Sequence, residues 1–281
     1  MNILPQRPRF NIIRFLSIIF LATIIFASFI ITNSNPFLLF SVSSLNSMGE
    51  FLKGFLSPDL SYNFISSTFI PVLLTIQIAT AGIATAILIG FPMALFASNI
   101  FFLSGPLTEG DPTPRYWIKI LRSLPYVTSR TILNFMRSIP ELIWALLFVR
   151  VFGLGPEAGI LGIGVAYAGI VGKVFSEILE NTDLNSAQAI RSYGTSRPKI
   201  ILFSILPSAI KNLVSYSLYR WECGMRAAAI LGFVGAGGLG QEIEISMRMF
   251  EHSRSATLII ELFLLVSLTD FISGYIRRKI S

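Results

Sequence analysis

Three of the ionisable side chains that interrupt an apolar stretch of this chain are of types that suggest anion chemistry. Arg220, Glu222 and Arg226 lie within the run 206–235, which is otherwise mostly apolar. A guanidinium group presents a planar fork of N–H donors that matches the oxygens of an oxyanion, so the two arginines are candidates for lining the path of such an ion. Glu222 lies one helical turn before Arg226, and these two side chains can instead neutralise each other. The sequence leaves both interpretations open.

A second candidate site lies in the polar segment 176–199, which cannot lie in lipid. Gly194 ends a short helix there, because glycine readily adopts the left-handed backbone conformation that lets the chain turn. A second short helix, 196–205, then leads back to an apolar run. Such a helix–glycine–helix hairpin offers a rigid knob to a partner protein, whereas an ordinary polar loop is the alternative. The marker residues of this segment are Gln188, Ala189, Gly194, Leu206 and Pro207.

A third pattern is misleading. Gly235, Gly237 and Gly240 match the G-x-G-x-x-G pattern of dinucleotide-binding folds. That fingerprint requires a preceding β-strand and a following helix within a βαβ unit, whereas here an apolar run precedes it. We therefore expect no nucleotide cofactor, and we interpret the glycines as a tight re-entrant turn at the external end of a membrane pore.

Other catalytic chemistry has little support in the residue types. No G-x4-G-K-[ST] phosphate-binding loop occurs, so energy from ATP must come from a partner chain. Cys223 is the single cysteine and His252 the single histidine. An intrachain disulfide, a thiolate-rich or multi-histidine metal site and histidine-based catalysis are therefore not expected.

Composition indicates which elements position these residues. Of 281 residues, 53% are hydrophobic and 13% are charged, and the mean hydropathy is +0.70. Soluble domains carry about 25% charged residues, so lipid must be the main solvent of this chain. We predict an all-α membrane protein with about six transmembrane helices. The apolar runs are 15–31, 70–97, 140–152, 158–172, 206–235 and 256–275.

The third and fourth runs are unusual, because each is shorter than the roughly 20 residues that cross a bilayer. Short helices interrupted by Gly or Pro are tolerated where other helices surround them or where they line a cavity. The run 158–172 is also rich in glycine, and small residues let membrane helices approach closely. We expect this run to pack against other helices, within the chain or across a dimer.

The basic residues predict the orientation in the membrane. Lys and Arg concentrate in the N-terminal segment, the stretch 115–137, the segment 173–199 and the C-terminal end, which share one side if successive helices alternate. Cytoplasmic segments carry this excess, so we expect a multi-pass inner-membrane protein with both termini cytoplasmic. The same bias explains the net charge of +7 without nucleic acid. Arg137 and Glu141 have helical spacing and are expected to pair near the cytoplasmic interface.

Two regions are predicted along the chain. Residues 1–67 contain an N-terminal transmembrane helix and an external loop, and residues 68–281 form the core domain. A cleaved signal peptide is the alternative for 15–31. That run is long for the apolar part of a signal peptide, however, and no clear small-residue cleavage site follows it.

The hairpin segment resembles the coupling loop of ABC importer permeases, whose pattern is roughly E-A-A-x3-G-x9-I-x-L-P. Ala189, Gly194, Leu206 and Pro207 match it, while Gln188 replaces the acid. Ile190 and Ser204 replace the second alanine and the isoleucine. Further segments resemble the phosphonate/phosphite branch of these permeases, so that the likeness covers roughly residues 68 to 280. They are 137–145, 153–156, 218–222 and 231–240.

This resemblance implies a type I ABC importer permease fold with a cytoplasmic coupling helix. The expected partners are two copies of a cytoplasmic ABC ATPase, a periplasmic substrate-binding protein, a second permease copy in a homodimer, and membrane lipid. The implied substrate is phosphonate or a related phosphorus oxyanion such as phosphite, phosphate or hypophosphite. The alternatives are a permease for an amino acid or a quaternary amine, and a membrane-embedded enzyme.

Overall fold

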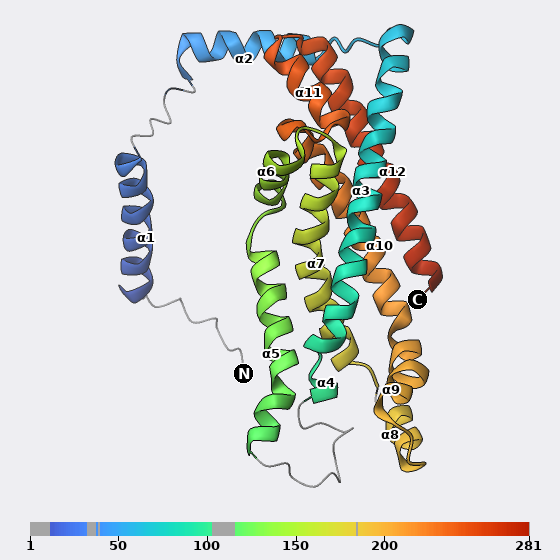
Figure 1. Ribbon diagram of the computed structural model, residues 1–281. Helices are drawn as coiled ribbons and strands as arrows, with labels where there is room; N and C mark the ends of the chain where they lie inside the picture. The colour runs from blue at the N-terminus through green and yellow to red at the C-terminus, as the bar shows by residue number, and fades with distance from the viewer. Residues whose placement is uncertain (1–11, 33–37, 39, 103–115, 184, 281) are drawn as a thin grey trace, which may run out of the picture. The chain divides into compact units, whose positions relative to one another are not determined.

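The computed structural model describes residues 12–32, 38, 40–102, 116–183 and 185–280 (Figure 1). All regular elements within these residues are helices, which confirms the predicted all-α class. The chain separates into two compact units, residues 1–53 and residues 54–281.

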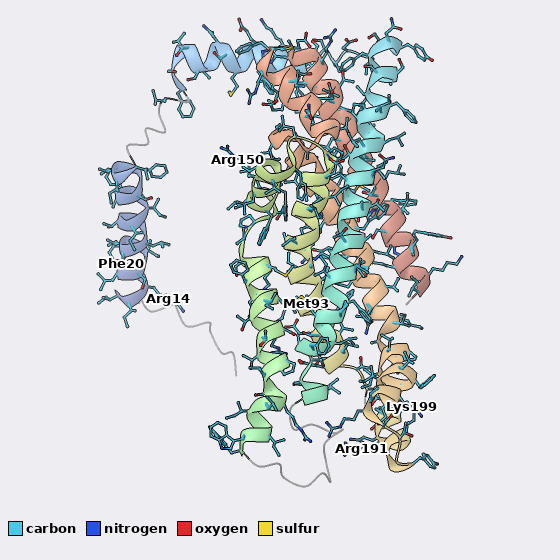
Figure 2. The ribbon with its side chains drawn as sticks, in the orientation of Figure 1. Arg14, Phe20, Met93, Arg150, Arg191 and Lys199 are labelled. Carbon is cyan, nitrogen blue, oxygen red and sulfur yellow. The ribbon has the colours of Figure 1, made fainter. Side chains whose placement is uncertain are left out.

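The first unit contains α1 (Ile12–Ile31) and most of α2 (Val42–Phe55). α1 has 20 residues and buries none of them. At 1.5 Å per residue this helix matches the ~30 Å hydrocarbon core of a bilayer. Figure 2 shows Phe20 projecting outward from it. α1 therefore has the length and the surface of the first predicted span.

The second unit is a bundle of five long helices joined by shorter ones (Figure 1). The long helices are α3 (Tyr62–Ala97), α5 (Tyr116–Ser138), α7 (Pro156–Glu180), α10 (Leu206–Leu231) and α12 (His252–Ile280). The short helices are α4 (Asn99–Phe102), α6 (Glu141–Phe152), α8 (Asn185–Ser192), α9 (Arg197–Ile200) and α11 (Gly238–Arg248). Two π-helical segments flank α10, namely η2 (Ile201–Ile205) and η3 (Gly232–Ala236).

The number of membrane crossings agrees with the prediction. Within the described residues, α1, α3, α7, α12 and the continuous stretch Arg197–Ala236 are long and apolar enough to cross a membrane. α5 and α6 together make a sixth candidate, with a bend of 88° between them.

The third crossing differs from the predicted span at 140–152. α6 has only 12 residues, and the 23-residue α5 precedes it in the same candidate span. Leu133 and Met136 of α5 are buried, and Leu133 contacts α7 beside Gly172. Four basic residues distributed along α5, together with its Ser and Thr residues, lower its average hydropathy, which is why the sequence did not reveal the helix.

The predicted ion pair between Arg137 and Glu141 is wrong. Pro140 has φ −55° and ψ 146°, an extended conformation that separates α5 from α6. The two residues are therefore on different helices, and the helical spacing argument does not apply to them. Within the described residues no ion pair joins them, and Arg137 instead packs its backbone against Gly169 of α7.

α7 lies at the centre of the bundle, packed against α3, α5, α6 and α10. Its small residues make this possible. A Cβ added at Gly162 would meet Ala145 of α6 at 2.9 Å, and one at Gly164 would meet Thr85 of α3 at 2.9 Å. The glycine-rich run predicted to mediate helix packing therefore does so within one chain.

Gly169 gives the most direct test of this packing. A Cβ there would lie 2.6 Å from the Arg137 backbone nitrogen and 2.7 Å from the Leu133 carbonyl oxygen, so the α5 backbone would have to move. We expect Gly169→Ala to destabilise the protein by about 1–3 kcal/mol, the usual cost of overpacking. The measurement is the thermal unfolding midpoint of the purified protein in detergent. Gly274→Ala, where a Cβ meets nothing within 4 Å, is the matched control and should change the midpoint little.

The glycine-rich segment after α10 forms the predicted tight turn, and its place at the external end of a pore stays a prediction. Gly235 has φ +88° and Gly237 φ +90°, conformations that residues with side chains rarely adopt. The chain turns so tightly that Gly232 and Gly240 touch through backbone atoms. The Leu239 backbone N–H then donates to the Thr75 hydroxyl of α3 at 2.9 Å. A helix, α10, precedes these glycines where a dinucleotide site requires a strand.

The α2–α3 connection is fixed to the start of α12 by polar contacts. Arg254 lies 3.8 Å from the Asp59 carboxylate and 2.9 Å from that of Glu251. The Thr257 hydroxyl donates to the Asp59 carbonyl oxygen at 3.0 Å. Hydrogen bonds from the side chain and the backbone N–H of Ser61 lower the pKa of the Asp59 carboxyl, so this carboxylate remains charged at neutral pH.

Candidate functional site

The predicted helix–glycine–helix hairpin is formed by α8 and α9. α8 ends at Ser192, and Gly194 has φ +73°, in the left-handed region. Ser196 is extended and precedes α9. The glycine at this position is therefore required by the backbone, because a side chain would find free space there but a strained conformation.

One face of the hairpin is anchored and the other is exposed. Ala187 is buried, in an apolar cluster that includes Phe175 and Leu179 of α7, whereas Gln188 and Ala189 are exposed. The Ser186 and Ser204 hydroxyls lie 2.8 Å apart and join α8 to η2. The hairpin is thus a rigid extension of the bundle. The hairpin also carries basic residues, among them the half-buried Arg191 and the exposed Lys199 (Figure 2).

Leu206 and Pro207 do not mark a break in the chain. Pro207 lies in the first turn of α10, which directly follows η2. Proline lacks an N–H and crowds the carbonyl group four residues earlier, and a π-helical turn is a common way to relieve such a conflict. The helix consequently runs on from Arg197 through Leu231, and this one rod connects the hairpin to the middle of the bundle.

A polar contact that the sequence did not suggest fixes the bundle next to the hairpin. Arg130 of α5 donates to the Glu180 carboxylate of α7 at 2.8 Å and to the Ala97 carbonyl of α3 at 3.0 Å. The Asn99 backbone N–H also donates to Glu180, at 2.8 Å. The end of α7 is therefore joined through the Glu180 carboxylate to the start of α4 and to Arg130 within α5, and Arg130 also holds the end of α3. Their separation in sequence removes any local signal for this cluster.

Arg220 lies in a cage of tyrosines. Its guanidinium carbon is 5.5 Å, 5.4 Å and 5.7 Å from the ring centres of Tyr167, Tyr216 and Tyr219. Its Nε donates to the Tyr216 hydroxyl at 2.8 Å. Aromatic faces attract a guanidinium ion without consuming its N–H donors. Within the described part of the chain, no acceptor takes a hydrogen bond from the two terminal nitrogens of Arg220. The guanidinium group is therefore held in place while these N–H donors remain available to a ligand.

Glu222 and Arg226 pair as the alternative interpretation expected. The Arg226 Nη2 donates to the Glu222 carboxylate at 3.0 Å. The Arg277 guanidinium of α12 lies 3.7 Å from the same carboxylate and 4.0 Å from the carboxylate of Asp270. Glu222 is buried, and an unpaired charge within a membrane costs at least about 2.5–3.5 kcal/mol on insertion scales. This cluster therefore joins α10 to α12, and the sequence missed Arg277 because it lies on another helix.

The structure thus separates the predicted site residues into two groups. Gln188, Ala189 and Gly194 belong to the hairpin. Arg220, Glu222 and Arg226 lie near the middle of α10, where Arg220 faces α7 through Tyr167 and Glu222 faces α12 through Arg277. Both groups are attached to the same continuous helix.

Comparison with known proteins gives the family. Residues 121–281, more than half of the chain, match the family model described as the binding-protein-dependent transport system inner membrane component. The chain is 34% identical to the putative phosphite transport system permease protein HtxC of Stutzerimonas stutzeri, over 73% of this chain and 67% of that one. It is 31% identical to the phosphite transport system permease protein PtxC of the same organism, over 74% and 69%. The phosphate-import permease protein PhnE of Mycolicibacterium smegmatis is 28% identical, over 73% and 35%.

Solved structures agree on the fold. A chain of the MetNI methionine ABC transporter in an inward-facing conformation superposes with a TM-score of 0.65 at 24% identity, over 79% of this chain and all of that one. An amino acid ABC transporter gives a TM-score of 0.55 at 16% identity, over 85% and 97%. With the helical bundle and the match over residues 121–281, this chain belongs to the family of binding-protein-dependent transport system inner membrane components.

Proposed function

We propose that this chain is the permease subunit of an ABC importer for a phosphorus oxyanion, with phosphite, phosphonate or phosphate as the substrate. The observation that carries the proposal is the identity of 31–34%, over about three quarters of the chain, to permeases named for phosphite transport. The substrate passes from a periplasmic binding protein across the inner membrane. A separate ATPase supplies the energy, and the relatives are transport permeases rather than enzymes.

The hairpin of α8 and α9 is the docking site for the ATPase in this proposal. Gln188, Ala189 and Gly194 form its exposed surface, while Leu206 and Pro207 begin the helix that leaves it. Support comes from its buried inner face and from the continuous helix that follows it, because a docking element has to be rigid to transmit a displacement. Lys199 and Arg220 are 21 residues apart on this helix, about 30 Å at 1.5 Å per residue.

Arg220 is the proposed contact for the substrate along the path. Its guanidinium is oriented by tyrosines rather than neutralised by a carboxylate. Its positive charge and its terminal N–H donors therefore remain available to an oxyanion. Glu222 and Arg226 have the structural role instead, because with Arg277 and Asp270 they form a cluster of two positive and two negative charges.

The proposed assembly contains two identical permease copies and two ATPases, with both termini of each permease in the cytoplasm. Six crossings, counting α5 and α6 as one, place the two ends of a chain on the same side. The basic C-terminal turn of α12, Arg277 to Lys279, favours the cytoplasmic side. ATP binding then moves the two hairpins together and biases the bundle between inward-open and outward-open states.

Uptake by reconstituted vesicles tests the substrate. The permease, its cognate ATPase and its cognate binding protein are placed in proteoliposomes, and ATP-dependent uptake of labelled phosphite, methylphosphonate and phosphate is measured. We expect uptake of at least one of these ions, and none of methionine or a quaternary amine. Uptake of methionine or the amine alone would overturn the oxyanion proposal, and failure of the ATPase to co-purify with the chain would favour a membrane-embedded enzyme.

A further inference from the structure

α2 has two chemically distinct faces. At about 100° per residue, the large apolar residues Val42, Leu45, Met48 and Leu52 share one side of the helix, and they are between 45% and 75% exposed. The opposite side carries only polar or charged residues. These are Ser43, Asn46, Ser47, Glu50 and Lys53. An apolar stripe of this kind is unstable in water unless something covers it.

The position of α2 along the chain limits what can cover this stripe. α1, an apolar helix with no buried residue, ends at Ile31, and α3 begins at Tyr62. Only residues 32–41 and 56–61 separate α2 from these two spans. Neither link has the roughly 20 apolar residues that a further helical crossing requires, so α2 lies on the membrane side where α1 ends and α3 begins. The first turns of α3 are themselves exposed and apolar at Ile65, Phe69 and Ile70.

We propose that α2 lies in the lipid–water interface at that face, with Leu45, Met48 and Leu52 inserted among the lipid chains. The proposal rests on α1 and α3 spanning the membrane. Lipid is the occupant favoured by chain continuity, because the helices directly before and after α2 in the sequence are spans with exposed apolar side chains. The exposed side chains of the stripe are aliphatic and include no Trp, Tyr or Arg, the residues that dominate protein–protein contacts. Helices with this pattern bind in the plane of the interface.

Spin labelling of the assembled transporter tests this placement. In a Cys223→Ser background, single cysteines replace Leu45 and Leu52 on the apolar face, and Ser43 and Asn46 serve as matched controls on the polar face. Labelled complexes are reconstituted in vesicles of phosphatidylethanolamine and phosphatidylglycerol. Collision rates with oxygen, which concentrates in lipid, and with a water-soluble nickel chelate are then measured.

We expect oxygen collisions to dominate at the two apolar sites and nickel collisions at the two polar sites, so that the depth parameter changes sign around the helix. Strong nickel collisions on both faces would place α2 in water and overturn the proposal. Low rates of both collisions on the apolar face would show that a protein surface, such as a second copy, covers it. Phe20→Cys in α1 is the reference: if it too lacks oxygen access, the membrane assignment of α1 fails instead.

Discussion

Replacing Gly194 with valine will strongly weaken the association of this chain with its ATPase. Gly194 has φ +73°, and an ordinary side chain in that conformation costs about 1–2 kcal/mol, with a further penalty for a β-branched residue. The hairpin relieves this strain only by changing the angle between α8 and α9, which displaces its exposed surface. We expect ATPase recovery in a pull-down to fall about tenfold or more, together with the loss of substrate-stimulated ATP hydrolysis.

Gly194→Asn distinguishes strain from steric obstruction of the interface. Asparagine tolerates the left-handed region better than other residues with side chains. Its side chain is about as large as that of valine, so steric obstruction would affect both variants, and a Cβ at this position meets nothing within 4 Å. Association should therefore be largely retained in Gly194→Asn. If the valine variant binds the ATPase as the wild type does, the hairpin is not the docking site.

Replacing Arg220 with alanine will reduce substrate uptake while leaving the complex assembled. Hydrogen bonds to a charged group contribute about 1.5–3 kcal/mol, which corresponds to about 10- to 150-fold in uptake at 1.4 kcal/mol per tenfold. The tyrosine cage holds this guanidinium without a carboxylate partner, so its removal leaves no buried opposite charge unpaired. The measurements are ATP-dependent uptake and recovery of the ATPase from the same preparation.

Two variants separate a substrate contact from a structural role. Tyr216→Phe removes the hydroxyl that orients Arg220 and should lower uptake less than Arg220→Ala does. Arg226→Ala removes the partner of the buried Glu222 and should lower the thermal unfolding midpoint, which Arg220→Ala changes less. Uptake at the wild-type rate in Arg220→Ala would exclude this residue from the oxyanion path.

The two predictions concern two positions along one continuous helix. The helix from Arg197 through Leu231 carries the hairpin at one end and the Arg220 cage further along. η2 lets this helix continue past Pro207, and the Glu222–Arg277 contact ties its middle to α12. If the ATPase displaces the hairpin, the helix that holds Arg220 moves with it, because the hairpin and Arg220 are connected by this one helix.

The sequence alone determined the features that depend on local conformation or on composition. The turn at Gly194 and the tight turn at Gly235 and Gly237 each arise within a few residues, where glycine conformation decides the outcome. Helical spacing gave the pairing of Glu222 with Arg226 as one of two interpretations, and the structure decided for it. The membrane class and the number of spans follow from the apolar runs.

The tertiary structure decided what depends on residues distant in sequence. It brought Tyr167 to Arg220, Arg277 to Glu222 and Arg130 to Glu180. It also showed that Pro140 puts Arg137 and Glu141 on different helices, and that α5 packs on the glycines of α7. Spacing along a sequence fixes a neighbour only while one regular helix continues, and beyond its end the packing of whole helices decides which side chains meet.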